Sequence, residues 1–408
     1  AGVSLNAIFS ENGIIKRAKD AQNKMDQATQ NDLDSINELN NWIDGKVNGT
    51  TGGNTTGGNT TGGDDNPSTT TTKISTLVEK VVDKNTKAED AYGNKITIPK
   101  GFKVLAHGTE DGSATYTYSG DNIPAVQDGI VIENGTDGNQ FVWVPVGTIN
   151  NKTGDSRGTT STITLGRYEF DSSTGSLTST TPAQVASVEN CTKVVPINKN
   201  YQELSTFREG NSTLDSTAQN ATARNLEEFI STTLENGGYY IARYEASGTT
   251  SKITSKYNQT VLGNITQPNA AKAAREMYGE VKENNELVYA SDLVNSYAWD
   301  TAIIFIQTYS GKTDYASYNE SKTTKAFTAT GKNNDKYCNI WDMSGNAFEW
   351  TTEYSTGSYA GNLSPCVIRG GCYYTGSGGA YYYTSYRHLN DPTYSSSNIG
   401  LRPLLYAK

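Results

Sequence analysis

The chain has 408 residues, which exceeds the length at which one hydrophobic core keeps growing, so more than one structural unit is expected. Only 35% of the residues are hydrophobic and 19% are charged, and 40 are glycine, a composition typical of a loop-rich protein with a modest core. A formal net charge of -9 offers no field that attracts nucleic-acid phosphates, and two histidines are too few for a zinc or iron site built from three imidazoles.

Residues 1–47 are predicted to form a long amphipathic helix, because apolar residues recur at three- and four-residue steps from Gly13 to about Val47. Periodicity alone fits equally a helix that packs on a globular core. The phrases Ala-Gly-Val-Ser-Leu and Glu-Asn-Gly-Ile-Ile-Lys-Arg-Ala resemble the region after the membrane segment of type IV prepilin-like proteins of Gram-positive bacteria. The resemblance implies a protein at the cell surface or on a pilus, assembled with pilin-like partners through this helix, with the membrane segment upstream of this sequence.

Residues 48–73 repeat Thr-Thr-Gly-Gly-Asn and continue into Ser/Thr-rich sequence. Such a tract buries too little apolar surface to fold, so we expect a flexible linker with a root-mean-square span of about 28 Å. Residues 74–100 are predicted to be a short connector, with apolar residues at helical steps from Ile74 to Val82 and an extended run at 94–98.

The remaining residues, 101–408, indicate an α+β domain with little regular secondary structure. Short β-like runs bounded by Gly, Asn and Asp are predicted at 114–118, 129–132, 140–146 and 238–245. Helices are predicted around 225–234 and 291–309.

The strongest motif is Asn-Ile-Trp-Asp-Met-Ser-Gly-Asn-Ala-Phe-Glu-Trp-Thr at 339–351, followed by Val-Ile-Arg-Gly-Gly at 367–371 and Asn-Ile-Gly-Leu-Arg-Pro at 398–403. This order and spacing resemble the formylglycine-generating-enzyme, or sulfatase-modifying-factor, family. Upstream, 141–146 and 240–245 resemble early core strands of that family. The resemblance implies a C-type-lectin-like fold preceded here by the helix and linker.

In that family the first of these loops holds a structural calcium ion. Carried over by position, the ligands are Asp342, the carbonyls of Gly345 and Ala347, and Glu349. Two carboxylates and two carbonyls are hard oxygen ligands that suit Ca²⁺. In the alternative reading, Asp342 caps the turn and Glu349 pairs with an arginine such as Arg369 or Arg402.

The family's catalysis uses a pair of cysteines after Arg-Gly-Gly that binds copper. Those positions carry Thr375 and Ala380, neither of which is a thiol, and Cys372 lies three residues early. No copper site and no enzymatic activity are therefore expected. Disulfide pairing among the four cysteines is not readable from the sequence.

The segment between Gly371 and Asn398 is rich in tyrosine, with seven of the 26 tyrosines in 22 residues. Tyr, Ser, Gly and Asn give large contacts at low entropic cost, as in antibody binding loops. The segment, and the final Asn-Ile-Gly-Leu-Arg phrase, also resemble the variable region of proteins diversified by retroelements, which share the lectin-like fold.

These features predict a displayed, non-catalytic binding protein whose ligand is an unknown protein or glycan on another cell or phage. Two alternatives are an oxidase of the parent family and a structural minor pilin, and the plainest alternative for the segment is an ordinary Tyr-rich surface. The predicted ligand-binding residues are Cys372, Tyr373, Tyr374, Thr375, Tyr381, Tyr383, Ser385, Tyr386, His388, Leu389, Asn390, Asp391, Thr393 and Tyr394.

Overall fold

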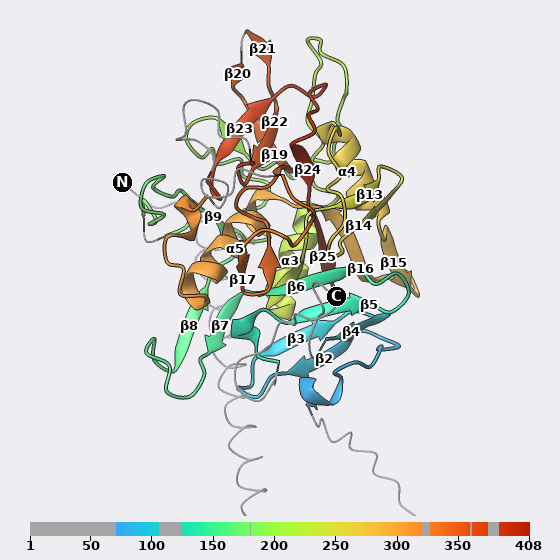
Figure 1. Cartoon of the computed structure of the whole chain (residues 1–408), viewed down its shortest axis with the longest axis vertical. Coiled ribbons are helices and arrows are strands. Elements are labelled where there is room, and N and C mark those ends of the chain that lie inside the picture. The colour runs from blue at the N-terminus through green and yellow to red at the C-terminus, as the bar shows by residue number, and fades with distance from the viewer. Residues whose placement is uncertain (1–70, 106–123, 180, 320–326, 360, 374–382) are drawn as a thin grey trace, which may run out of the picture. The chain divides into compact units, whose positions relative to one another are not determined.

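The computed structural model describes residues 71–105, 124–179, 181–319, 327–359, 361–373 and 383–408 (Figure 1). All of them belong to the unit Thr69–Lys408. The predicted helix 1–47, the linker up to residue 70 and the predicted strand at 114–118 lie outside the described residues. In the described part of the chain, no helix is long and apolar enough to cross a bilayer.

A seven-stranded sheet with the order β15-β16-β25-β12-β6-β5-β4 carries much of the core. Every neighbouring pair in it is antiparallel. In the register of the central strands, Tyr240 lies opposite Trp143 on one side and Leu405 on the other, and all three side chains are buried. The strands are β4 (Phe102–Val104), β5 (Val131–Asn134), β6 (Gln140–Pro145), β12 (Gly238–Ala242), β15 (Glu280–Glu283), β16 (Glu286–Leu293) and β25 (Pro403–Ala407).

A second sheet with the order β11-β19-β22-β23 unites the motifs of the C-terminal third, and β24 pairs with β19 in parallel. Trp350 lies opposite Ile368 in one neighbouring strand and Leu401 in the other, so three phrases distant in sequence form adjacent strands. The strands are β11 (Tyr201–Gln202), β19 (Phe348–Ser355), β22 (Cys366–Arg369), β23 (Arg387–Asn390) and β24 (Ile399–Leu401).

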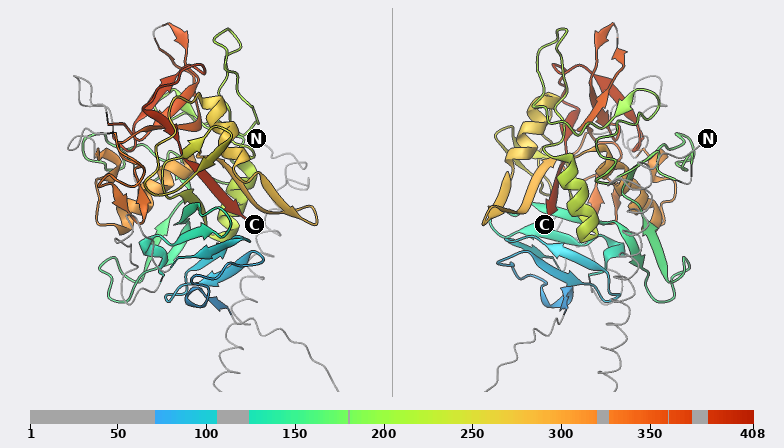
Figure 2. Two further views of the ribbon diagram at one scale, coloured as in Figure 1. Left: turned by 45° about the vertical axis from the view of Figure 1, so that its right-hand side comes forward. Right: turned by 180° about the vertical axis from the view of Figure 1, so that it is seen from behind.

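Three α-helices are found among the described residues: α3 (Leu226–Asn236), α4 (Gln267–Glu276) and α5 (Ser296–Tyr309). The Asn225 and Asn295 side chains cap α3 and α5 by accepting the backbone N–H of the third residue after each. Buried side chains surround most of α5, which contacts β6, β9 and β19, so this helix lies between the two main sheets (Figures 1 and 2).

Smaller elements complete the unit. A three-stranded sheet, β1-β2-β3, lies at the opposite end from the β20–β21 hairpin in all three views (Figures 1 and 2). The remaining bounds are β1 (Thr72–Lys73), β2 (Thr86–Glu89), β3 (Lys95–Ile98), β7 (Gly147–Asn150), β8 (Thr160–Ile163), β9 (Gly166–Arg167), β10 (Gln184–Val185), β13 (Ser247–Thr249), β14 (Lys252–Thr254), β17 (Lys336–Tyr337), β18 (Ile340–Trp341), β20 (Ser358–Tyr359), β21 (Asn362–Leu363), and the 3-10 turns η1 (Ile74–Thr76), η2 (Val126–Asp128) and η3 (Tyr315–Ser317).

The predicted α+β class agrees with the mixture of short strands and few helices. Two differences are informative. Residues 291–293 end strand β16, so the predicted helix begins only at Ser296. The predicted helical steps at 74–82 contain only the turn η1, and Ile74 and Val82 belong to the same hydrophobic cluster as the seven-stranded sheet, so the connector is packed on the main core.

Candidate ligand-binding site

A cavity of about 480 Å³ opens beside the second sheet and is called here the recognition cavity. Residues of β22, β23, the β20–β21 hairpin and the turn before β24 line it. These elements meet at one end of the unit (Figure 1). The lining residues are Phe348, Tyr359, Asn362, Ser364, Ile368, Cys372, Tyr386, His388, Asn390, Asp391, Tyr394, Asn398 and Ile399.

The alternation of side chains along β23 decides which residues reach the cavity. His388 and Asn390 line it, whereas Arg387 points to the buried interior and Leu389 packs near Gly357. Because His388 lies opposite Ile368 of β22, the two strands present one continuous face to the cavity.

Aromatic rings form a connected wall of the cavity. The His388 ring lies 5.5 Å from Tyr359 and 6.0 Å from Tyr386, and the Tyr386 ring lies 6.3 Å from Phe348, all between centroids. Tyr359 and Tyr394 are 61% and 44% exposed, although large aromatic side chains are usually buried. The wall therefore combines a packed base with rings that are open to solvent.

Polar turns hold the other side of the cavity. The Asp391 Oδ1 atom accepts the Thr393 backbone N–H at 2.8 Å and the Thr393 hydroxyl, which fixes the turn that presents Tyr394. The buried Cys372 Sγ accepts the Asn398 Nδ2 amide at 3.3 Å. Local hydrogen bonds thus preorganise the polar lining.

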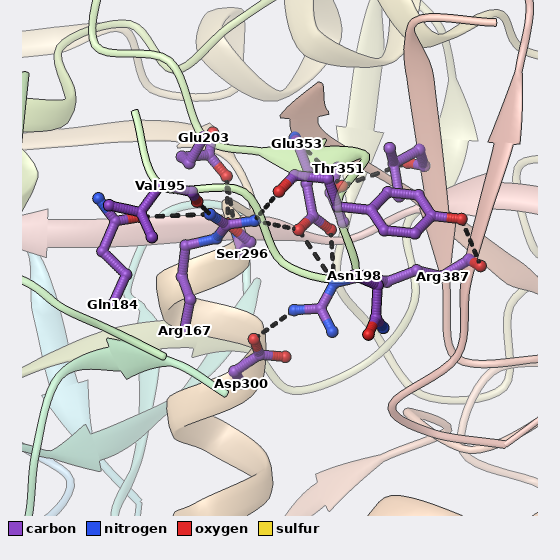
Figure 3. A network of polar contacts seen from close by, with 12 residues as sticks. Arg167, Gln184, Val195, Asn198, Glu203, Ser296, Asp300, Thr351, Glu353 and Arg387 are labelled. Atoms are coloured by element: carbon purple, nitrogen blue, oxygen red, sulfur yellow. Dashed lines mark hydrogen bonds and ion pairs between the residues drawn. The ribbon is translucent and has the colours of Figure 1, made fainter. Parts of the chain in front are cut away.

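A buried charge network includes the Arg387 side chain of β23 (Figure 3). Glu353 of β19 binds three guanidiniums: Arg167 at 2.6 Å, Arg387 at 3.0 Å and Arg369 at 3.4 Å. Arg369 and Arg387 also bind Asp300 of α5. Burial raises the pKa of Glu353, but the three guanidiniums outweigh it and lower that pKa from 4.5 to about 2. The network joins β9, β19, β22 and β23 to α5, so the strand that lines the cavity rests on a fixed support.

The structure brings six of the predicted ligand-binding residues together in the cavity: Cys372, Tyr386, His388, Asn390, Asp391 and Tyr394. Tyr374, Thr375 and Tyr381 lie outside the described residues.

The other five predicted residues do not line the cavity. Tyr373 packs on Phe327, and Tyr383 packs on Tyr386. Ser385 is only 6% exposed and does not line the cavity. Its backbone carbonyl accepts a hydrogen bond from Arg369, so it serves the support. Leu389 points away from the cavity because side chains alternate along β23. Thr393 donates hydrogen bonds to the Asp391 carboxylate and fixes its orientation.

Sequence reasoning missed the contribution of the β20–β21 hairpin. Tyr359, Asn362 and Ser364 reach the cavity only because the chain between β19 and β22 folds over β23. The sequence around Tyr359 is rich in Ser, Gly and Asn, which predicts an exposed turn, but it lies outside the tyrosine-rich segment. Phe348, Ile368, Asn398 and Ile399 were read as framework residues, and they also line the cavity.

The comparisons with known proteins give a family. Residues 131–406 match the sulfatase-modifying factor enzyme 1-like domain, named FGE-sulfatase. The chain belongs to this family. A search of curated proteins finds no match. Among solved structures, CarF is 16% identical, with a TM-score of 0.29 over 42% of this chain and 87% of CarF. Treponema denticola variable protein 1 is 12% identical, with a TM-score of 0.26 over 67% of this chain and 97% of that protein.

In this member of the sulfatase-modifying factor family, the predicted calcium loop contains two buried carboxylates, Asp342 and Glu349. Glu349 follows the alternative arrangement, because both of its oxygens accept hydrogen bonds from Arg402. The Asp342 Oδ2 atom accepts the Gly331 N–H at 2.7 Å, and its buried Oδ1 atom accepts no hydrogen bond of standard geometry from the described residues, although the Asn333 side chain lies near enough to lower the pKa of the carboxyl. Burial raises the pKa of Asp342 to about 7, although Gly331 and Arg402 oppose the rise.

Two more buried carboxylates, Glu245 and Asp335, lie in the same cluster, where burial and the charge of Asp342 raise the pKa of each. An excess of buried negative charge requires protons or a cation. Asp342 therefore fits a calcium ligand, whereas Glu349 is held by Arg402. Among the described residues, no group of three or more acidic, His or Cys side chains is arranged to hold a metal, and calcium binding stays a prediction.

The cysteines of this sulfatase-modifying factor family member do not form the thiol pair of the family's copper chemistry. No disulfide joins any two of the four cysteines, Cys191, Cys338, Cys366 and Cys372. The two positions that match the family's catalytic cysteines carry Thr375 and Ala380. The side chains at these positions do not fit a copper ion, because neither supplies a thiolate.

Proposed function

We propose that this protein is a non-catalytic ligand-binding protein and that the recognition cavity is its binding surface. The supporting observation is the meeting, in one cavity, of six residues of the tyrosine-rich segment with the β20–β21 hairpin. Open aromatic rings beside amide and carboxylate groups supply apolar contact and directional hydrogen bonds together, which is the usual lining of a specific binding site.

The rigid support behind β23 favours the same proposal. A binding site loses affinity when its own side chains must be ordered on binding. Here the buried network of Glu353 and Asp300 holds Arg387 in β23, and the Trp299 Nε1–H donates to the Thr384 carbonyl at 3.0 Å just before that strand. Substitutions at the cavity face can therefore change the ligand without disturbing the framework.

Binding is tested with the full chain on arrays of glycans and cell-surface proteins. The double variant Tyr359→Ser/Tyr394→Ser removes two exposed rings and should retain the wild-type melting temperature while losing the ligands that the array identifies. Tyr92→Ser, at the β2–β3 turn, is the matched control and should bind normally. A double variant that binds every ligand as the wild type does would show that the site lies elsewhere.

The non-catalytic part of the proposal has its own test. The full chain, Cu(I), oxygen and a sulfatase-derived cysteine peptide should yield no formylglycine by mass spectrometry, because Thr375 and Ala380 cannot provide the thiol pair. Catalytic turnover of the peptide would contradict the proposal and favour an oxidase.

The proposal extends to display at the surface of a Gram-positive cell, with the helix 1–47 in a pilin-like assembly and the linker 48–73 spacing the domain from it. It also includes diversification of the cavity by a retroelement and an adhesin-like role toward another cell or a phage. Antibody labelling of intact cells tests display, and labelling only after lysis would contradict it. A reverse transcriptase gene beside a near-copy of the gene's 3′ end is the corresponding test of diversification.

A further inference from the structure

We infer that the recognition cavity takes a cationic group, the ammonium of a lysine or the guanidinium of an arginine presented by a protein partner. The inference rests on the proposed function and names the chemistry of its ligand. Its parts are an uncompensated carboxylate, a wall of aromatic rings and the lack of a Lys or Arg side chain among the described residues that line the cavity.

The first step is the charge of the cavity. Asp391 is the acidic residue among those that line it, and none of the described lining residues is Lys or Arg. In the sequence from 372 to 398, Arg387 is the one Lys or Arg residue. Its guanidinium is buried against Asp300 and Glu353, so it gives no positive charge to the cavity.

The remaining basic side chain of the segment is His388. Burial lowers the pKa of its imidazole below the ordinary value of 6.5, against a smaller opposing effect of the Leu389 backbone. The ring is therefore neutral at neutral pH. It adds an aromatic face beside Tyr359 and Tyr386 and leaves the charge of Asp391 uncompensated.

The second step is the availability of the Asp391 carboxylate. Its Oδ1 atom accepts the Thr393 N–H and hydroxyl, which fixes the orientation of the group. Its Oδ2 atom makes no hydrogen bond or ion pair with any described residue. The carboxylate is half-buried and keeps some contact with water. A ligand that covers the carboxylate must therefore replace the hydrogen bonds of the water that the ligand displaces. A cation does so with a charge-assisted hydrogen bond.

The third step is the aromatic wall. Tyr359, Tyr386, Tyr394 and Phe348 line the same cavity as Asp391. The negative face of an aromatic ring attracts an ammonium or guanidinium, and the attraction increases when the cation leaves water. Aromatic faces with one carboxylate are thus selective for a cation over a neutral aliphatic group of the same size.

A neutral sugar is the main competing ligand, because it also stacks on rings and binds amides. It would bury the Asp391 charge without neutralising it, which is the costlier arrangement. The volume of about 480 Å³ falls in the range that holds a drug-sized ligand and accommodates a long basic side chain with its neighbours.

The experiment measures binding of the full chain to surfaces that carry the peptide acetyl-Gly-Gly-X-Gly-Gly. X is lysine, arginine, trimethyllysine, the uncharged carbon isostere of trimethyllysine, norleucine or glutamate. We expect lysine and arginine to bind at least fivefold more tightly than norleucine, and trimethyllysine more tightly than its isostere. A preference for arginine over lysine or the reverse identifies the cation and supports the inference in either case.

Two variants localise the effect. Asp391→Asn should reduce the cation preference at least fivefold, which corresponds to about 1 kcal/mol. Asp83→Asn, the same change at an exposed position with no partner among the described residues, should leave it unaltered. Tyr359→Leu keeps an apolar side chain and removes the ring, so it should reduce the advantage of trimethyllysine over its isostere. Melting temperatures confirm that each variant is folded.

The results separate this inference from the proposed function. Equal binding of lysine and norleucine peptides, or an unchanged preference in Asp391→Asn, overturns the cationic ligand. If a glycan then binds the wild type and is lost in Tyr359→Ser/Tyr394→Ser, the binding function stands with a different ligand. If that double variant keeps every ligand, the proposed site and the cationic ligand both fail.

Discussion

Replacement of Glu353 by glutamine tests the support behind β23. The change keeps the size of the side chain and removes the charge that Arg167, Arg369 and Arg387 share. At about 1.4 kcal/mol per pH unit, a pKa lowered from 4.5 to about 2 corresponds to about 3 kcal/mol of stability. Leaving buried guanidiniums without their partner typically costs about 3–5 kcal/mol. We therefore expect Glu353→Gln to lose about 3–5 kcal/mol at pH 7.

Urea denaturation followed by tryptophan fluorescence measures this loss. Because the folded pKa lies below the unfolded one, the stabilisation is complete above about pH 4.5 and disappears as the pH falls through about 2. The difference in the free energy of unfolding between the wild type and Glu353→Gln should therefore decrease as the pH falls from about 4.5 to about 2. Glu189→Gln, at an exposed position without a described partner, is the control and should unfold like the wild type.

Two results would refute this account of the network. One is a Glu353→Gln protein within about 0.5 kcal/mol of the wild type at pH 7, the usual range for surface changes. The other is a gap that stays constant from pH 5 to pH 2, which would show that the lost stability comes from packing and not from the carboxylate charge.

Three further outcomes are expected. Trp350→Ala should cost about 3–5 kcal/mol in urea denaturation, because the indole is fully buried and donates to the Ile265 carbonyl at 2.8 Å. Tyr394→Ser should change the free energy of unfolding by no more than about 0.5 kcal/mol, because that side chain is exposed. Tyr386→Ser removes a ring packed on Phe348 and should lower the free energy of unfolding by about 0.5–3 kcal/mol. Equal losses in the two variants would contradict the assigned burial. Calcium should raise the melting temperature of the wild type above its value in chelator. A hundredfold excess of calcium over Kd corresponds to a gain of about 2.7 kcal/mol in the free energy of unfolding, and Asp342→Asn should abolish it. An equal rise in that variant would place the ion elsewhere.

The C-terminal framework was predictable because its signals are local. Trp350, Arg369 and Arg402 stand in compact phrases whose aromatic and glycine residues specify strands and turns, and those phrases do pair in one sheet. The tyrosine-rich segment was likewise recognisable as a surface, and part of it lines the cavity.

Other features depend on tertiary contacts that no local pattern encodes. Helix α4 is buried through alanines, so it lacks the large apolar residues by which periodicity is recognised. The hairpin residue Tyr359 joins His388 across the fold, 29 positions away. Tyr386 was predicted only as a ligand-binding residue, but its partly buried side chain also packs on the ring of Phe348 and the hydrophobic cluster around it.

The choice of partner for Glu349 could not be made from sequence for the same reason. Arg369 and Arg402 were both candidates, and each lies in a strand beside β19 or just after one. Arg369 lies directly opposite Glu349 in the register, yet its guanidinium binds Asp300 and Glu353, whereas Arg402, just after β24, binds Glu349. The buried carboxylates of α5 and β19, and not the strand register, therefore determine which arginine each carboxylate binds.

The alternation of β23 has a consequence for how this gene can vary over generations. Arg387 and Leu389 point away from the cavity, Arg387 into the buried charge network and Leu389 toward Gly357, whereas His388 and Asn390 line the cavity. Selection should therefore remove mutations in codons 387 and 389 more often than mutations in the neighbouring codons 388 and 390. Among descendants of one ancestral gene, we expect residues 388 and 390 to vary more than residues 387 and 389, so inherited change along this strand would have a period of two.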